Sequence, residues 1–201
     1  KLQAGARGYD LVVPSNYAVE ILLATRRLAP LDPAWLPNLA NLDPRFRDPP
    51  YDPGNRHSVP YLWGTSGIAV RTDRVPEPVD SWAVLWDRAH AGKMTMLDDA
   101  REVLGAALKL LGYSLNSTNP RELEEAKELC LEQKPLLKAY VSAPVKPLLI
   151  AGDVWLAQLW SGDTFQAARE APAIRYAIPR EGSALWADNL CILATAPHKR
   201  A

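Results

Sequence analysis

The sequence KMTMLDDAREVLGAALKLL, at residues 93–111, decides the fold class, because it places a strand, a turn and a helix in one continuous run. Residues 93–97 have the apolar character of a strand. Residues 99–111 have apolar positions at helical spacing, and Gly112 follows as a stop signal. A strand that leads directly into a helix is the repeating unit of α/β proteins.

The same order of signals recurs along the chain in both directions. Residues 9–13 form an apolar run closed by Pro14, and the capping residues Ser15 and Asn16 precede a helical periodicity over 17–28. Further strands are expected at 59–63, 67–71, 154–159, 174–178 and 190–194, and further helices at 81–86, 120–131 and 163–170. This alternation predicts an α/β fold, with a proline-rich covering or functional segment over 29–57.

Composition excludes several classes of function. The 201 residues include 23 Lys and Arg against 23 Asp and Glu, and a net charge of zero is unfavourable for binding nucleic acid. No run of 18 apolar residues occurs, so no membrane-spanning segment is expected. Cys130 and Cys191 lack the spacing of metal ligands, so we expect buried free thiols, no metal site and no cofactor.

Acidic and aromatic residues gather where predicted strands end. Asp98 to Val103 follows the strand quoted above, and Trp160 to Asp163 follows the strand at 154–159. A third cluster, Trp186 to Asp188, is extended, and its spacing directs the ring and the carboxylate to one face. Ligands of α/β folds bind outside the carboxyl ends of strands, so these clusters are candidate ligand contacts.

Local structure gives the first cluster a second interpretation. Asp99 and Glu102 have the spacing of a capping box, and acidic residues stabilise the first turn of a helix. As ligand contacts, the carboxylates and tryptophans would instead suit a molecule with several positive nitrogens joined by methylenes. Carboxylates form charge-assisted hydrogen bonds with such nitrogens, and aromatic faces cover the methylenes.

Catalytic signals are weak in comparison. The three histidines lie in or near predicted loops, and neither a nucleophile elbow nor a phosphate-binding loop occurs, so no enzyme is expected. Two alternatives stay open. One is a glycosidase-like hydrolase with two carboxylates as acid and base, although Asp99 and Glu102 share one helix turn. The other is a receptor for a sugar, iron or an organic anion, although an anion would require cationic groups.

Several long motifs, in order along the chain, resemble the spermidine/putrescine-binding proteins of bacterial ABC transporters. The resemblance runs from about residue 2 to residue 198, and it rests on GYDLVVPS at 8–15, SVPYLWG at 58–64, Ser81-Trp82 with Leu85-Trp86, Asp98 to Val103 and Trp186 to Asp188. It implies a fold of the type II periplasmic binding proteins, with two α/β lobes joined by hinge strands. It also implies a polyamine held in the cleft between the lobes and delivered to an ABC permease.

The resemblance assigns roles to individual residues. Ser15 and Tyr17 would belong to the ligand wall of the first lobe. Asp99 and Glu102 would meet terminal ammonium groups, with Trp160 packing nearby. Trp186 would stack along the methylenes, and Asp188 would pair with a nitrogen. Asp163 completes a Trp-x-Gly-Asp typical of putrescine-preferring members, whereas Asp99 to Glu102 is typical of spermidine-preferring members, so the preferred polyamine stays open.

The resemblance also implies an organisation into lobes. Residues 1–65 would be a partial first lobe, 66–186 the second lobe, and 187–201 a hinge strand that returns to the first lobe. Family members have further N-terminal and C-terminal portions, and the chain begins with Lys1 rather than Met, so we expect an incomplete first lobe. The implied location is the periplasm, or an extracytoplasmic lipoprotein.

Overall fold

The computed structural model describes residues 8–199, which divide into two compact units. Within this range, unit 2 comprises Gly64–Leu185, and unit 1 comprises the residues up to Trp63 together with those from Trp186 onward. None of the helices in the described range is long and apolar enough to span a bilayer. Each unit is described by itself below.

Unit 2 is built on a mixed sheet whose strand order is β6, β2, β5, β3, β4. The strand β2 is antiparallel to β5 and β6, whereas β3 is parallel to β4 and β5. In this register, Ser66 of β2 lies opposite Trp160 of β5. The strand bounds are β2 (Ser58–Arg71), β3 (Met94–Met96), β4 (Leu137–Tyr140), β5 (Leu156–Trp160) and β6 (Ile174–Ala177).

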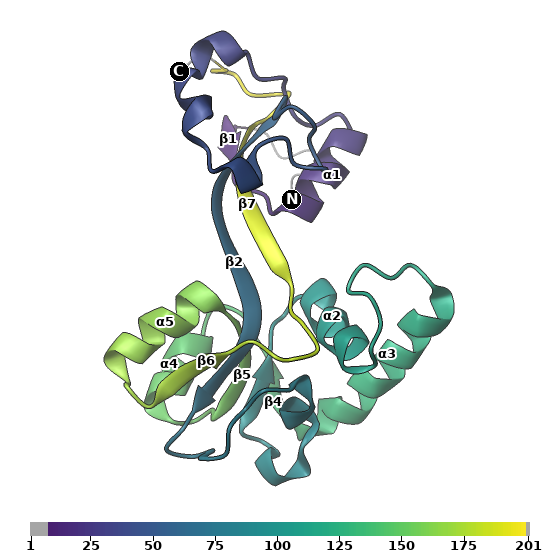
Figure 1. Ribbon diagram of the computed structural model, residues 1–201, viewed down its shortest axis with the longest axis vertical. Helices are drawn as coiled ribbons and strands as arrows, with labels where there is room; N and C mark the ends of the chain where they lie inside the picture. Colours follow the sequence, from purple (N-terminus) through teal and green to yellow (C-terminus); the bar gives the residue numbers. More distant parts are fainter. Residues whose placement is uncertain (1–7, 200–201) are drawn as a thin grey trace. The chain divides into compact units, whose positions relative to one another are not determined.

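Helices cover both faces of this sheet (Figure 1). Alternate residues of β2 point to opposite faces of the sheet, and each face has its own hydrophobic core. Ile68 and Val70 pack with Val103 on one face, whereas Ala69 packs with Val145 on the other. The first face is covered by α2 (Ala100–Leu110), the helix α3 (Pro120–Gln133) packs on α2, and the second face is covered by α4 (Val145–Ala151) and α5 (Ser161–Glu170).

Unit 1 has a smaller sheet with one long helix. The strand β1 (Leu11–Val12) is antiparallel to β7 (Leu185–Ile192), with Leu11 opposite Ile192. The helix α1 (Asn16–Ala24) buries Val19 and Leu22 in a core with Cys191 and Leu193. The proline-rich segment forms three short 3₁₀ helices, η1 (Pro33–Trp35), η2 (Pro37–Asn41) and η3 (Pro44–Phe46), each beginning with proline, which is favoured at a first helical position.

The structure corrects several predicted elements. Residues 59–63 and 67–71 are parts of one strand, because β2 continues through Gly64 without a turn. The helix at 17–28 ends early at Ala24, where the Thr25 hydroxyl donates to the Ile21 carbonyl at 2.8 Å and Arg26 takes a φ of 53°. The segment at 81–86 is a 3₁₀ helix, η4 (Trp82–Trp86), rather than an α-helix.

Two further elements were not predicted. The strand β4 has only four residues, and the helix α4 has seven residues with Pro147 inside it. Short elements give little periodicity, and a proline within a helical pattern argues against a helix. Both elements lie beside the candidate site of unit 2, so their position matters for the function.

Candidate ligand-binding site

The predicted acidic clusters of unit 2 lie at one edge of its sheet. Because β3, β4 and β5 are parallel, their carboxyl ends meet at the same edge. Asp98 and Asp99 follow β3, and Ser161 to Asp163 follow β5. The antiparallel strand β2 brings Ser66 to this edge, opposite Trp160. We call this group of residues the acidic edge: Ser66, Asp99, Glu102, Trp160 and Asp163.

Asp99 has the local role that the capping interpretation predicts. It is the N-cap of α2, and its Oδ1 accepts hydrogen bonds from the amides of Arg101 at 2.8 Å and Glu102 at 3.2 Å. These bonds satisfy two amides that have no partner within the helix. The carboxylate of Asp99 is therefore fixed in orientation at the start of α2.

Glu102 is held one turn further along the same helix and is partly buried. Burial raises the pKa of its carboxyl group, and the Ser66 hydroxyl beside it partly offsets this effect. The neighbouring Asp99 carboxylate raises the pKa further, whereas Arg101 lowers it. A carboxylate in this environment gains from a cation more than an exposed carboxylate does, because little water solvates its charge.

Gln158 fixes the backbone beneath the acidic edge, and no pattern in the sequence singles it out. This buried side chain projects from β5, where its Nε2 donates to the Glu102 carbonyl at 2.8 Å and its Oε1 accepts from the Leu97 amide at 3.4 Å. The end of β3 and the first turn of α2 are therefore connected through one side chain.

Tyr176 is a second residue of this edge that the sequence did not single out. Its hydroxyl donates to the Thr65 carbonyl at 2.9 Å and lies 2.8 Å from the Thr65 hydroxyl. It packs directly on Gly67, where an added Cβ would lie 2.6 Å from both the Tyr176 hydroxyl and the Ala177 carbonyl oxygen. Burial raises the pKa of Tyr176, and the Glu102 carboxylate raises it further.

The cluster after β5 contains an ion pair. Trp160 packs partly against the core of the α4 and α5 face, and an added Cβ at Gly162 would meet nothing within 4 Å. The carboxylate of Asp163, in the first turn of α5, lies 3.0 Å from the ammonium of Lys146 on α4. Lys146 was not a predicted site residue, because α4 was not predicted.

The predicted residues of unit 1 form a separate group. The Ser15 hydroxyl donates to Asp188 Oδ1 at 2.7 Å, so it does not cap α1, although Ser15 stands at the N-cap position. Tyr17 lies in the first turn of α1. Trp186 and Asp188 occupy alternate positions of β7, which confirms the predicted shared face. The buried Trp186 Nε1 has no hydrogen-bond partner among residues 8–199.

A serine, a histidine and an aspartate do meet in unit 1, but without the geometry of a nucleophilic triad. Asp52 is buried and accepts hydrogen bonds from the Ser58 hydroxyl at 2.7 Å and from the amides of His57 and Ser58. The serine hydroxyl therefore donates to the carboxylate. A serine nucleophile would instead donate its hydroxyl hydrogen bond to an imidazole. The described part of the chain contains no group of three or more potential metal ligands.

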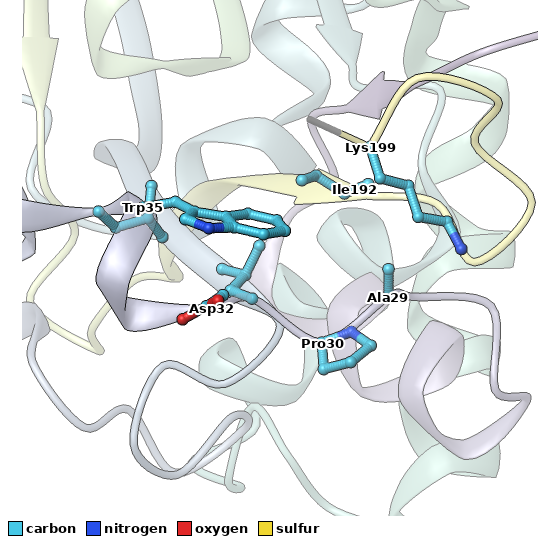
Figure 2. Close-up of a pocket in the computed structure, with 8 residues that line it drawn as sticks. Ala29, Pro30, Asp32, Trp35, Ile192 and Lys199 are labelled. Carbon is cyan, nitrogen blue, oxygen red and sulfur yellow. The ribbon is translucent and has the colours of Figure 1, made fainter. Parts of the chain in front are cut away.

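A cavity of about 230 Å³ lies elsewhere in unit 1 (Figure 2). Its walls include Ala29, Pro30, Trp35 and Ile192, and they are mainly apolar. Asp32 lines it too, but its Oδ1 accepts from the Ala34 amide at 3.0 Å. Lys199 brings a positive charge to the rim, as Figure 2 shows. The cavity has one carboxylate and one ammonium group, so it lacks the excess of negative charge that the acidic clusters provide.

Both cysteines are free, as predicted, although only Cys191 is fully buried and Cys130 is partly exposed. Burial raises the pKa of Cys130 to about 11 and that of Cys191 to about 12. Neither thiol is therefore an activated nucleophile at neutral pH.

The fold and the sequence together define the class of protein. Residues 1–201 match the family described as bacterial extracellular solute-binding protein, and the chain belongs to this family. The particular relatives agree with the resemblance found in the sequence. The chain is 40% identical over 193 residues to the spermidine/putrescine-binding periplasmic protein of Escherichia coli, covering 95% of this chain and 55% of that protein.

Two further comparisons extend this result. The chain is 37% identical over 206 residues to the putrescine/cadaverine-binding protein of Pseudomonas aeruginosa, covering 96% of this chain and 58% of that protein. A solved spermidine/putrescine ABC transporter structure from Listeria monocytogenes superposes with a TM-score of 0.94 at 37% identity, covering 98% of this chain and 62% of that one. The chain thus spans a little over half the length of the curated relatives it matches.

Proposed function

We propose that this chain is part of a receptor that binds a polyamine and delivers it to an ABC permease. The observation that carries the proposal is the acidic edge of unit 2, where Asp99 and Glu102 follow β3 and Trp160 ends the neighbouring strand β5. Carboxylates bind ammonium groups, and an indole ring covers methylenes and attracts cations. The names of the relatives, at up to 40% identity, support the same ligand class.

The acidic edge suits a cation for a physical reason. Asp99 is held by two backbone amides, and Glu102 lies in surroundings that raise its pKa through burial. A positively charged ligand would stabilise the charge of Glu102, which burial deprives of water. The carboxylates of Asp99 and Glu102 would both be oriented before the ligand binds. Preorganised charges of this kind bind more tightly because little order is lost on binding.

We infer that three residues of unit 1 also contact the ligand and that a fourth, Ser15, positions one of them. Asp188 would pair with a nitrogen, and the Ser15 hydroxyl, at 2.7 Å from its Oδ1, would hold that carboxylate in place. Trp186 would lie along the methylene chain, since it shares a face of β7 with Asp188, and Tyr17 would complete the aromatic wall. The remaining contact candidate, Asp163, lies 3.0 Å from the ammonium of Lys146.

The same proposal covers the organisation and location of the receptor. Residues 1–65 would belong to the first lobe, 66–186 to the second, and 187–201 to a strand that returns to the first. By similarity to periplasmic and lipoprotein relatives, the receptor would act outside the cytoplasmic membrane. Catalysis, a metal and a nucleic-acid partner form no part of the proposal.

A hydrolase is the weaker alternative. Two catalytic carboxyl groups of a glycosidase must face each other across a groove, about 5 to 9.5 Å apart. Asp99 and Glu102 lie three residues apart on one helix, and Asp99 is engaged as the N-cap. A receptor for an organic anion is also disfavoured, because the candidate positions are acidic.

Titration calorimetry with spermidine and putrescine tests the proposal on the complete natural chain. We expect heat of binding for at least one of the two, and we expect Asp188→Asn to weaken it by about ten- to a hundredfold, the range for one charge-assisted hydrogen bond. The matched control is Glu124→Gln, which removes an exposed carboxylate paired with Lys127 and should change the affinity less than about twofold. Absence of heat at both low and moderate salt would refute the proposal.

A further inference from the structure

Lys146 brings an ammonium group to the acidic edge. It lies in the first turn of α4, the helix that follows β4, and β4 is parallel to β3. Its Nζ lies 3.0 Å from Asp163 Oδ1 and 2.8 Å from Gln166 Oε1. The first contact is an ion pair and the second is a hydrogen bond from a charged donor, so Lys146 takes the place beside Asp163 that an ammonium group of a ligand would take.

The position of Lys146 is unfavourable without this partner. The N-terminus of a helix carries partial positive charge, which destabilises a cation in the first turn. The first turn of α4 contains no acidic residue of its own to compensate. Asp163, which stands in the first turn of α5, supplies the compensating charge from the neighbouring helix.

The pair is partly shielded from water. The Lys146 side chain is 35% exposed and that of Asp163 is 28% exposed, whereas the two members of the Lys127 and Glu124 pair on α3 are 55% and 60% exposed. Salt and water screen a partly buried pair less than an exposed one. The attraction between Lys146 and Asp163 is therefore screened less than that between Lys127 and Glu124.

We propose that Lys146 determines the amine specificity of this receptor by occupying Asp163. The proposal rests on the proposed function, because it concerns the same ligand. Lys146 neutralises one of three carboxylates at the acidic edge and leaves Asp99 and Glu102 for the ligand. A ligand with three positive nitrogens then finds two carboxylates at the acidic edge instead of three, so it loses more than a ligand with two positive nitrogens does.

Calorimetry with putrescine and spermidine tests this on the complete natural chain and its variants. Lys146→Met should tighten spermidine binding by about tenfold and putrescine binding by less, since the freed Asp163 carboxylate can pair with a third ammonium group. Asp163→Asn should weaken binding in the original chain, more for spermidine than for putrescine, because it leaves the charge of Lys146 uncompensated. The double variant lacks both charges and should bind within about twofold of the original chain. Lys146→Arg, which keeps the charge, should bind as the original chain does.

A matched control separates the local effect from a change in net charge. Lys138 is an exposed lysine on β4, and Lys138→Met should leave both affinities unchanged within about twofold. Should Lys146→Met fail to fold, Lys146→Gln removes the same charge with a side chain that can still hydrogen-bond to Asp163. A loss of binding in Asp163→Asn that is as large as in Glu102→Gln and persists in the double variant would overturn the proposal, because Asp163 would then be a ligand contact.

The outcomes distinguish this proposal from the proposed function. If the original chain binds polyamines and Glu102→Gln does not, but Lys146→Met has unchanged or weaker affinity, only the role of Lys146 is refuted. A gain in Lys146→Met that survives Asp163→Asn also refutes it. If the original chain binds no polyamine, both proposals fail together.

Discussion

In unit 2 the candidate contact Asp99 is held by its neighbours in sequence, whereas in unit 1 the candidate contact Asp188 is held by a residue from a distant segment. In unit 2, Asp99 accepts from amides two and three residues further along. In unit 1, the bond from Ser15 to Asp188 joins residues 173 positions apart. The orientation of Asp99 is kept as long as the first turn of α2 stays folded. The contact between Ser15 and Asp188 depends in addition on the packing of α1 and β7.

The two units also differ in how well their apolar surface is covered. The sheet of unit 2 has a buried cluster on each face. In unit 1, alternate residues of the β1 edge, Tyr9, Leu11 and Val13, are each more than half exposed. Since burial of apolar surface supplies most folding stability, we expect unit 1 to open more readily than unit 2.

Thiol alkylation gives the largest expected contrast, because each unit contains one cysteine. In native buffer, Cys191 of unit 1 should react more slowly than Cys130 of unit 2, because the Cys191 side chain is buried whereas that of Cys130 is partly exposed. At low urea the order should reverse, as unit 1 opens first. Mass spectrometry of pulse-labelled chains measures both rates. An unchanged order up to the main unfolding transition would show that unit 1 is not the less stable unit.

Gly67→Ala should disrupt unit 2. The new Cβ would meet the Ala177 carbonyl oxygen and the Tyr176 hydroxyl at 2.6 Å, and the first of these belongs to the backbone and cannot move aside. We expect a loss of about 3 kcal/mol in the free energy of unfolding. Urea denaturation followed by tryptophan fluorescence measures it. Gly162→Ala is the control, because its Cβ would meet nothing within 4 Å, and it should stabilise α5 slightly.

Ser15→Ala should weaken unit 1 without affecting unit 2. It removes the hydroxyl that donates to Asp188 at 2.7 Å, at a cost of about 1 kcal/mol for a partly exposed bond. Hydrogen exchange should rise in α1 and β7 but not in α2. Equal increases of the exchange rate in both units would contradict the claim that the contact between Ser15 and Asp188 stabilises unit 1 alone. Thr25→Ala, which removes a hydroxyl at the other end of α1, is a matched control that leaves Asp188 untouched.

Glu102→Gln should change the free energy of unfolding least of the three variants. It should raise this free energy, whereas Gly67→Ala and Ser15→Ala should lower it. Burial raises the pKa of Glu102, so the native state holds its proton at higher pH than the unfolded chain does. The free energy of unfolding of the original chain therefore falls as the pH rises from the ordinary glutamate value through the raised pKa. The glutamine variant lacks this fall, and at neutral pH it should be more stable by up to about 1 kcal/mol.

Thermal unfolding at pH 4 and pH 7 measures this difference, with Glu124→Gln as the exposed control. Equal stability of the Glu102 variant and the original chain at both pH values would mean that the carboxyl group is solvated in the native state. A Glu102→Gln variant that is less stable than the original chain at pH 7 would mean that the Glu102 carboxylate is already paired with a positive group in the native state.

The local features of the fold followed from the sequence. The carboxylate of Asp99 and the proline at the start of α3 determine where helices begin, and both act within one turn. Asp99, Glu102, Trp160 and Asp163 were singled out because they follow predicted strands, and residues after parallel strands meet at one edge. Ser66, which the antiparallel strand β2 brings to the same edge, was not singled out.

Other features depend on contacts that no local pattern reveals. Ser15 looks like a helix cap, and only the approach of Asp188 from β7 redirects its hydroxyl. Lys146 lies on a seven-residue helix that contains a proline, so its pairing with Asp163 could not be anticipated.

The central claim is that the acidic edge of unit 2 binds the ammonium groups of a polyamine. Calorimetry of spermidine and putrescine with the complete natural chain and with Glu102→Gln tests it most directly. We predict that the variant stays folded and loses at least about tenfold in affinity for the polyamine that the original chain binds. A folded Glu102→Gln variant that binds as tightly as the original chain would contradict the claim.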